Sequence, residues 1–167
     1  MGLFTNNIFP DGGEDGSGGG IIQTVFVDDT TARSFNINNA THTTSLQASI
    51  TLNDSSNKVI IMYSVNASGN GSWGGMFFGL KRDSTSLVNA ENSNNPFGGL
   101  NCQATSNGHN QSLNFPIFYI DSPNDTSSHT YKVLINGVSG CGNGYINRSN
   151  SVSTAGRSAL ILYEVCS

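Results

Sequence analysis

The residues of this 167-residue chain that could carry acid-base or nucleophilic chemistry are few and widely separated. Three histidines, His42, His109 and His129, each stand among Thr, Ser, Asn and Gly. None has a nucleophile and an orienting group at the spacing that a catalytic triad requires. We therefore expect three solvated loop histidines, no catalytic residue and no enzymatic activity.

The acidic residues give an equally weak signal. Asp28 and Asp29 are adjacent, so on a strand they would point to opposite faces. They predict the end of a strand rather than the paired carboxylates of a glycoside hydrolase. Asp121 and Asp125 flank Pro123 in a turn and could bind calcium, but an oxygen cage usually takes more carboxylates. We predict no metal and no cofactor.

Three cysteines, Cys102, Cys141 and Cys166, form neither a CxxC motif nor a zinc-ligand pattern. We expect three reduced thiols, and a Cys102–Cys141 disulfide is the alternative left open.

Charge and hydropathy restrict the partners. The net charge is −4, and the basic residues form no cluster beyond Lys81 and Arg82, which argues against nucleic acid. No apolar run approaches the roughly 20 residues that cross a bilayer, and the N-terminus lacks the pattern of a signal peptide. We expect synthesis in the cytoplasm, no membrane partner, and release, if any, by a route other than secretion.

The first twenty residues differ from the rest of the chain. Leu3, Phe4, Ile8 and Phe9 form an apolar tip, and residues 11–20 have the glycine-rich composition of a linker. A short apolar tip cannot form its own core, so it must fold back onto the domain or bind another molecule. We predict an anchoring arm over residues 1–20 and a single domain over residues 21–167.

The pattern of apolar and polar residues in the domain predicts a series of short strands separated by turns rich in Asn, Gly and Ser, with little helix. The pattern predicts an all-β, jelly-roll-like sandwich of about 8–10 antiparallel strands. An immunoglobulin-like sandwich is the alternative, although its Cys…Trp…Cys pattern is missing. The expected strands are 21–27, 34–38, 45–52, 58–65, 73–82, 84–90, 114–121, 130–135, 143–147 and 158–165.

Several of these strands are apolar on both faces, most clearly 59–62, 76–78, 117–120 and 160–163. One face of an antiparallel sandwich strand normally meets water, so such strands need a second cover. A neighbouring subunit is one possible cover, and the loop over residues 91–111 is the other. The candidate subunit-interface residues are Phe77, Phe78, Phe118, Ile161 and Tyr163.

An ordered set of short motifs runs from residue 21 to residue 165. The set includes FYIDSP (118–123), TYKV (130–133), YINRS (145–149) and the closing SALILYEV (158–165). In this order the motifs resemble the trimeric jelly-roll domains of tailed-phage and marine viral virion proteins, which occur as head-decoration, fibre and tail-fibre proteins. The resemblance implies a homotrimeric, non-enzymatic structural module on the virion surface.

Only twenty residues precede the domain, without repeats, heptads or a shaft. This favours a capsid decoration or cement protein whose arm binds the major capsid protein or another virion protein. The alternative is the receptor-binding head of a tail or capsid fibre. In that case Trp73 and Phe97 would contact host surface glycans.

Overall fold

The computed structural model is an all-β sandwich, and it describes residues 4–6, 20–70, 75–89, 99–101, 113–137, 139–140, 142–148 and 156–166. Within these residues the chain forms twelve strands. They are β1 (Phe4–Asn6), β2 (Ile21–Asp29), β3 (Arg33–Asn36), β4 (Ala40–Thr51), β5 (Lys58–Asn70), β6 (Gly75–Arg82), β7 (Thr85–Val88), β8 (Gly99–Asn101), β9 (Leu113–Asp121), β10 (Ser128–Gly137), β11 (Asn143–Ile146) and β12 (Ser158–Val165).

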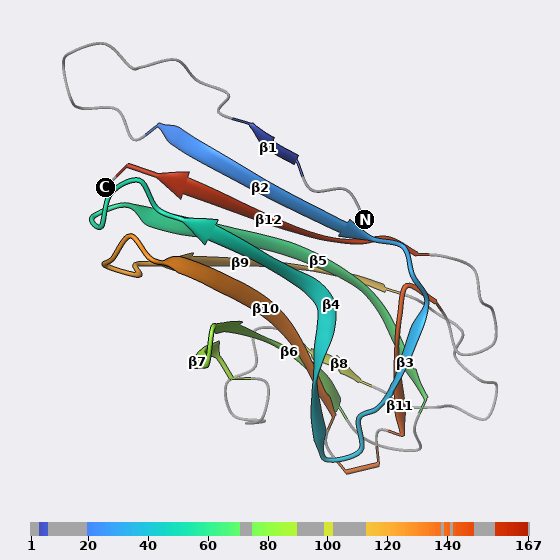
Figure 1. Cartoon of the computed structure of the whole chain (residues 1–167). Coiled ribbons are helices and arrows are strands. Elements are labelled where there is room, and N and C mark those ends of the chain that lie inside the picture. Colours follow the sequence, from blue (N-terminus) through green and yellow to red (C-terminus); the bar gives the residue numbers. More distant parts are fainter. Residues whose placement is uncertain are drawn as a thin grey trace.

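The strands form two antiparallel sheets that lie face to face (Figure 1). The first sheet has the order β1-β2-β12-β5, β9 pairs with the opposite edge of β5, and β11 and β3 extend the sheet beside the last residues of β5. The second sheet has the order β4-β10-β6-β7, and β8 also pairs with β6. The successive long strands β2, β4, β5, β6, β9, β10 and β12 alternate between the two sheets. This is the connectivity of a jelly roll.

Alternation along each strand explains why the sheets pack. In β4 the side chains of Leu46, Ala48 and Ile50 are buried, and those of Gln47 and Ser49 between them are exposed. A strand side chain changes face at every residue, so one apolar set enters the core. The sandwich core is built in this way from both sheets, and its largest fully buried apolar side chains are Ile37, Leu46, Ile61, Met76, Phe78, Leu80, Tyr131, Ile135, Ile146, Leu160 and Leu162.

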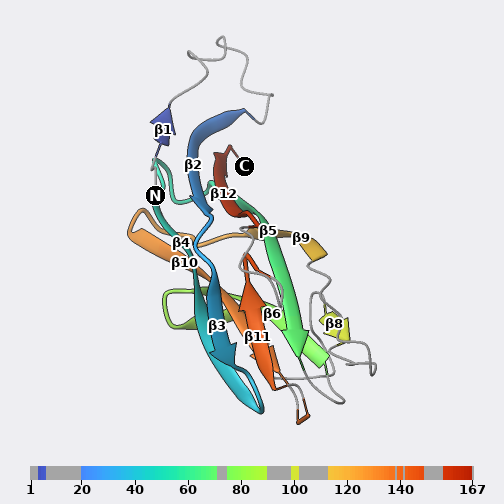
Figure 2. The same cartoon turned by 90° about the vertical axis from the view of Figure 1, so that its right-hand side faces the viewer.

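All ten predicted strands are present, and the structure adds β1 and β8. Two strands extend five residues beyond the prediction: β4 begins at Ala40, and β5 continues to Asn70 although its apolar run ends at Val65. Its polar extension is held by β11, which pairs with residues 67–70, and Figure 2 shows β11 beside this end of β5. Ser68 is fully buried there, and its hydroxyl donates a hydrogen bond to the carbonyl oxygen of Arg148 at 2.8 Å, so the buried polar group has a partner.

A buried polar cluster joins the two sheets. The carboxylate of Asp121 on β9 accepts hydrogen bonds from the Arg82 guanidinium of β6 and from the Tyr131 hydroxyl of β10, each at 2.7 Å. Asp121 is 7% exposed and Tyr131 is fully buried, so this contact lies inside the sandwich. Burial and the Asp121 carboxylate raise the pKa of Tyr131 far above its usual value. The tyrosine therefore stays protonated and can donate to Asp121.

Candidate functional site

The histidines are not the solvated loop residues that we expected. His42 lies in β4, where its Nε2 atom is 2.7 Å from the carbonyl oxygen of Asn36 and its ring lies beside Phe35. His129 lies in β10 and is only 8% exposed. The prediction was wrong for these two because neighbouring strands cover polar positions that look like turns in the sequence. His109 lies outside the described residues.

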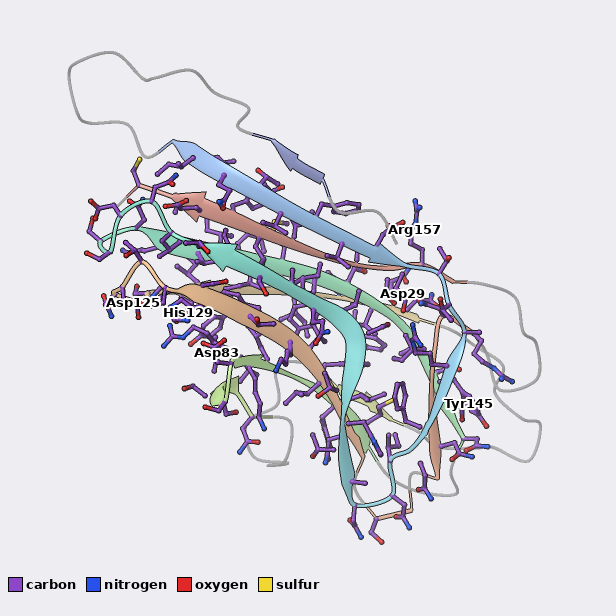
Figure 3. The ribbon with its side chains drawn as sticks, viewed as in Figure 1. Asp29, Asp83, Asp125, His129, Tyr145 and Arg157 are labelled. Atoms are coloured by element: carbon purple, nitrogen blue, oxygen red, sulfur yellow. The ribbon has the colours of Figure 1, made fainter. Side chains whose placement is uncertain are left out.

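His129 is held between two carboxylates at one end of the sandwich, opposite the end that carries Asp29 and Arg157 (Figure 3). Its Nδ1 atom is 2.8 Å from Asp83 and its Nε2 atom is 3.0 Å from Asp125. The N–H of Thr130, and next the His129 ring, lower the pKa of Asp83 by hydrogen bonding. The cluster ties the β6–β7 turn to the loop before β10, which is a structural role.

The acidic side of this cluster predicts a pH dependence. The pKa of Asp83 is lower in the folded chain than in the unfolded chain, so its ionised form stabilises the fold above about pH 4, and this contribution is lost as the pH falls. Because the Asp83 side chain is 46% exposed and solvent screens its interactions, we expect Asp83→Asn to lower the free energy of unfolding by less than about 1 kcal/mol at pH 6 and to flatten its decline between about pH 4 and pH 2. Urea denaturation across this range measures both effects, and an unchanged decline would contradict the assignment.

The other candidate groups also have structural partners. Asp28 and Asp29 end β2, as predicted: Asp28 pairs with Arg157, and Asp29 accepts the N–H of Thr31 at 2.9 Å and the hydroxyl of Ser45. Asp121 and Asp125 bind different partners and do not converge on one site. Among the described residues no group of three or more His, Cys, Asp or Glu side chains could hold a metal ion. Cys166 is an exposed free thiol, and the other two cysteines lie outside the described residues.

The outward face of the first sheet is the feature that needs a functional explanation. Residues opposite one another in antiparallel strands share a face. One row across the sheet consists of Phe26, Ile161, Met62 and Phe118, from β2 through β12 and β5 to β9. The residues that precede and follow each of these four in the sequence point into the core, so the row itself points outward. An apolar row therefore crosses four strands on the outside of the protein.

A second outward row lies beside the first and has Tyr163, Ile60 and Ile120 on β12, β5 and β9. Phe118 is 54% exposed and Ile120 is 57% exposed, and they are the large hydrophobic residues that the described part of the chain exposes. Contiguous apolar surface of this kind marks interaction sites. We call the six residues of β5, β9 and β12 in these two rows the outer patch: Ile60, Met62, Phe118, Ile120, Ile161 and Tyr163.

The outward face of the second sheet differs in character. Gln47, Ser49 and Thr51 are exposed on β4, and Lys132 and Lys81 face each other on β10 and β6. These polar side chains suit contact with water, although Phe77 of β6 and the buried Leu134 of β10 also lie on this side of the sheet. Among the described residues, the large apolar side chains that are more than half exposed lie on the outward face of the first sheet alone.

The predicted interface residues fall in three places. Phe118, Ile161 and Tyr163 lie together in the outer patch, which Ile60, Met62 and Ile120 complete. Phe77 is half-buried on the outward side of β6, in the second sheet. Phe78 is fully buried between the sheets and has no surface for a partner. Ile60, Met62 and Ile120 belong to the doubly apolar strands that the sequence singled out, but alternation alone does not say which of the two faces is the core.

The arm is described only in part. Phe4 belongs to β1, whose backbone pairs with β2 at the edge of the first sheet, with Phe4 opposite Phe26. Leu3, Ile8 and Phe9, like the possible glycan contacts Trp73 and Phe97, lie outside the described residues. The described residues contain no helix that is long and apolar enough to cross a membrane.

No known protein family and no curated protein matches the sequence. Among solved structures, the chain is similar to a chain in the structure of infectious bursal disease virus Gt strain, with a TM-score of 0.43, 14% identity, and coverage of 95% of this chain and 43% of that one. It is also similar to the VP2 subviral particle of infectious bursal disease virus, with a TM-score of 0.39, 13% identity, and coverage of 95% and 42%. The chain thus spans less than half the length of these chains.

Proposed function

We propose that this chain is a non-enzymatic structural protein of a virion surface. In this proposal it is a homotrimer that decorates or cements the capsid and is attached through residues 1–20. The observation that carries the proposal is the outer patch: the first sheet faces outward with apolar residues across several strands, two of them more than half exposed, and the described part of the second sheet exposes no large apolar residue to that extent. Such a domain is suited to assembly on one side and to solvent on the other.

The sequence supports this role in two further ways. Its ordered motifs between residues 118 and 165 resemble those of virion jelly-roll domains. The arm joins an apolar tip to a glycine-rich linker; residues 4–6 pair with β2 of the same chain, and Leu3, Ile8 and Phe9 are the apolar residues that this proposal assigns to a neighbouring protein. Each large apolar side chain of the tip would contribute about 1.5–3 kcal/mol if fully buried in a partner. Three arms on one trimer would raise the avidity further through effective concentration.

The arm is tested by binding to empty heads of the virus that encodes the chain. We expect deletion of residues 1–20, and also the triple variant Leu3→Ser, Ile8→Ser and Phe9→Ser, to weaken binding at least a hundredfold, because both remove apolar burial that several kcal/mol of binding would require. Co-sedimentation of the full-length chain and each variant with the heads measures this loss.

The control is the triple variant Asp11→Ser, Glu14→Ser and Asp15→Ser, which changes as many residues of the arm without removing an apolar one. It should bind as the unmodified chain does, apart from a change in salt dependence. If the deletion binds with unchanged affinity, the arm does not attach the protein and the proposed function is wrong in this part.

A further inference from the structure

A hollow of about 230 Å³ lies in the outward face of the first sheet, at the edge of the outer patch, and Met62, Phe118 and Ile161 of that patch form part of its wall. It forms because Ala159 of β12 and Ser64 of β5 are small and stand opposite each other. Larger side chains of the next row rise on one side of them. The outward residues that line the hollow are Met62, Ser64, Pro116, Phe118, Ala159 and Ile161.

The same face also carries a projection. Phe118 and Ile120 are alternate residues of β9, so both point outward, and each is more than half exposed. Phe118 is a wall of the hollow, whereas Ile120 lies one row further along β9, about 7 Å away, and does not line it. The projecting Ile120 and the hollow are therefore separate parts of one sheet face.

We infer that the occupant of this face is a second copy of the chain, whose Ile120 enters the hollow over Ser64 and Ala159. The inference rests on the proposed function and names the contact through which its subunits associate. The hollow is smaller than the roughly 300–1,000 Å³ of sites that bind small molecules, and its size suits one large side chain. Its walls are apolar apart from Ser64, so burial of apolar surface drives the contact.

The size of the face fits association between copies. Four strands about 4.8 Å apart and about eight residues long, at about 3.3 Å per residue, make a flat footprint of roughly 500 Å². Corrugated side chains raise the accessible area above that footprint, toward the roughly 800 Å² per partner that stable interfaces bury. Two copies of one twisted sheet also have matching curvature and can pack face to face about 10 Å apart.

Charge also favours an apolar contact. The charged side chains at the margins of this face are Lys58, whose row lies beyond Tyr163, and Asp28, which is already paired with Arg157 at 2.6 Å. Copies of a chain with net charge −4 repel one another weakly at long range. The association should therefore persist, and even strengthen, when salt is raised.

The contact permits a closed ring. Because the projection and the hollow are separate parts of one face, each copy can give its projection to one neighbour and its hollow to the other. Such head-to-tail contacts close into rings when the rotation between copies allows it. A ring of three copies accounts for the homotrimer that the proposed function requires.

The experiment removes each half of the contact separately in the full-length chain. Ile120→Asp removes the projection, Ala159→Phe fills the hollow, and Gln47→Asp places the same charge on the polar edge of the second sheet as a control. Light scattering coupled to size-exclusion chromatography measures the mass at micromolar concentration. We expect trimers for the unmodified chain and the control, and monomers for the other two. Melting curves check folding; Ile120→Ser replaces Ile120→Asp, and Ala159→Leu replaces Ala159→Phe, if either does not fold.

Mixing gives the sharper result. The Ile120→Asp chain keeps its hollow and the Ala159→Phe chain keeps its projection, so an equimolar mixture should form dimers although neither chain does so alone. Folded variants that keep the mass of the unmodified chain, or a mixture that stays monomeric, would overturn the inference. An unmodified chain that is monomeric yet binds empty heads would also overturn it and leave the arm attachment standing. Intact trimers that do not bind heads would instead count against the proposed function alone.

Discussion

Phe78→Ala is expected to lower the free energy of unfolding by about 3–5 kcal/mol, because the substitution removes a fully buried ring and leaves a cavity. The ring lies between the two sheets, 5.4 Å from the centroid of the Phe115 ring and within the main hydrophobic core. Neighbouring strands close over it and cannot collapse into the space without moving a sheet. Guanidinium denaturation measures the loss, and the midpoint should fall with an unchanged slope.

Phe118→Ala is the matched control, since the residue type and the substitution are the same and only the position differs. Phe118 is 54% exposed, so its truncation should cost the monomer less than about 1 kcal/mol. Both variants are best compared in the Ala159→Phe background, which is expected to be monomeric, because association adds a concentration-dependent term to stability. Equal losses at the two positions would show that Phe78 is not the core residue the structure makes it.

These two phenylalanines also show how far the sequence determines the site. Alternation predicts that Phe77 and Phe78 point to opposite faces of their strand. It does not say which face is the core, because both residues are apolar. The choice depends on pairing: Phe78 stands opposite the buried Ile135 of β10, and Phe77 stands opposite Asn136. The strands and the existence of doubly apolar segments were therefore predictable, and the division of each segment into core and outer patch was not.

The polar clusters could not be predicted from the sequence, for a different reason. His129 meets Asp83, which is 46 residues away, and Arg82 meets Asp121 at a separation of 39 residues. Such contacts exist only after β6, β9 and β10 have taken their places in the two sheets. A local reading treats His129 as a loop residue because its neighbours are Ser and Thr. Its burial follows from the strand pairing and the turn that close over it.

Asp121→Ala is expected to cost about 3–5 kcal/mol, because it leaves the Arg82 guanidinium inside the protein without its carboxylate partner. The side chains of Arg82 and Asp121 are 19% and 8% exposed, so water compensates little of the loss. The Tyr131 hydroxyl loses its acceptor in the same step. Because these groups come from both sheets, the loss should appear as a lower midpoint of cooperative unfolding, which thermal and urea denaturation both measure.

The control is the Arg157–Asp28 pair, whose atoms are 2.6 Å apart but whose arginine side chain is 69% exposed. Asp28→Ala should cost less than about 1 kcal/mol, because solvent screens an exposed ion pair. The comparison separates burial from distance, since the exposed pair is slightly the shorter of the two. Tyr131→Phe, alone and combined with Asp121→Ala, completes a double-mutant cycle, and a coupling near zero would contradict the shared hydrogen bond.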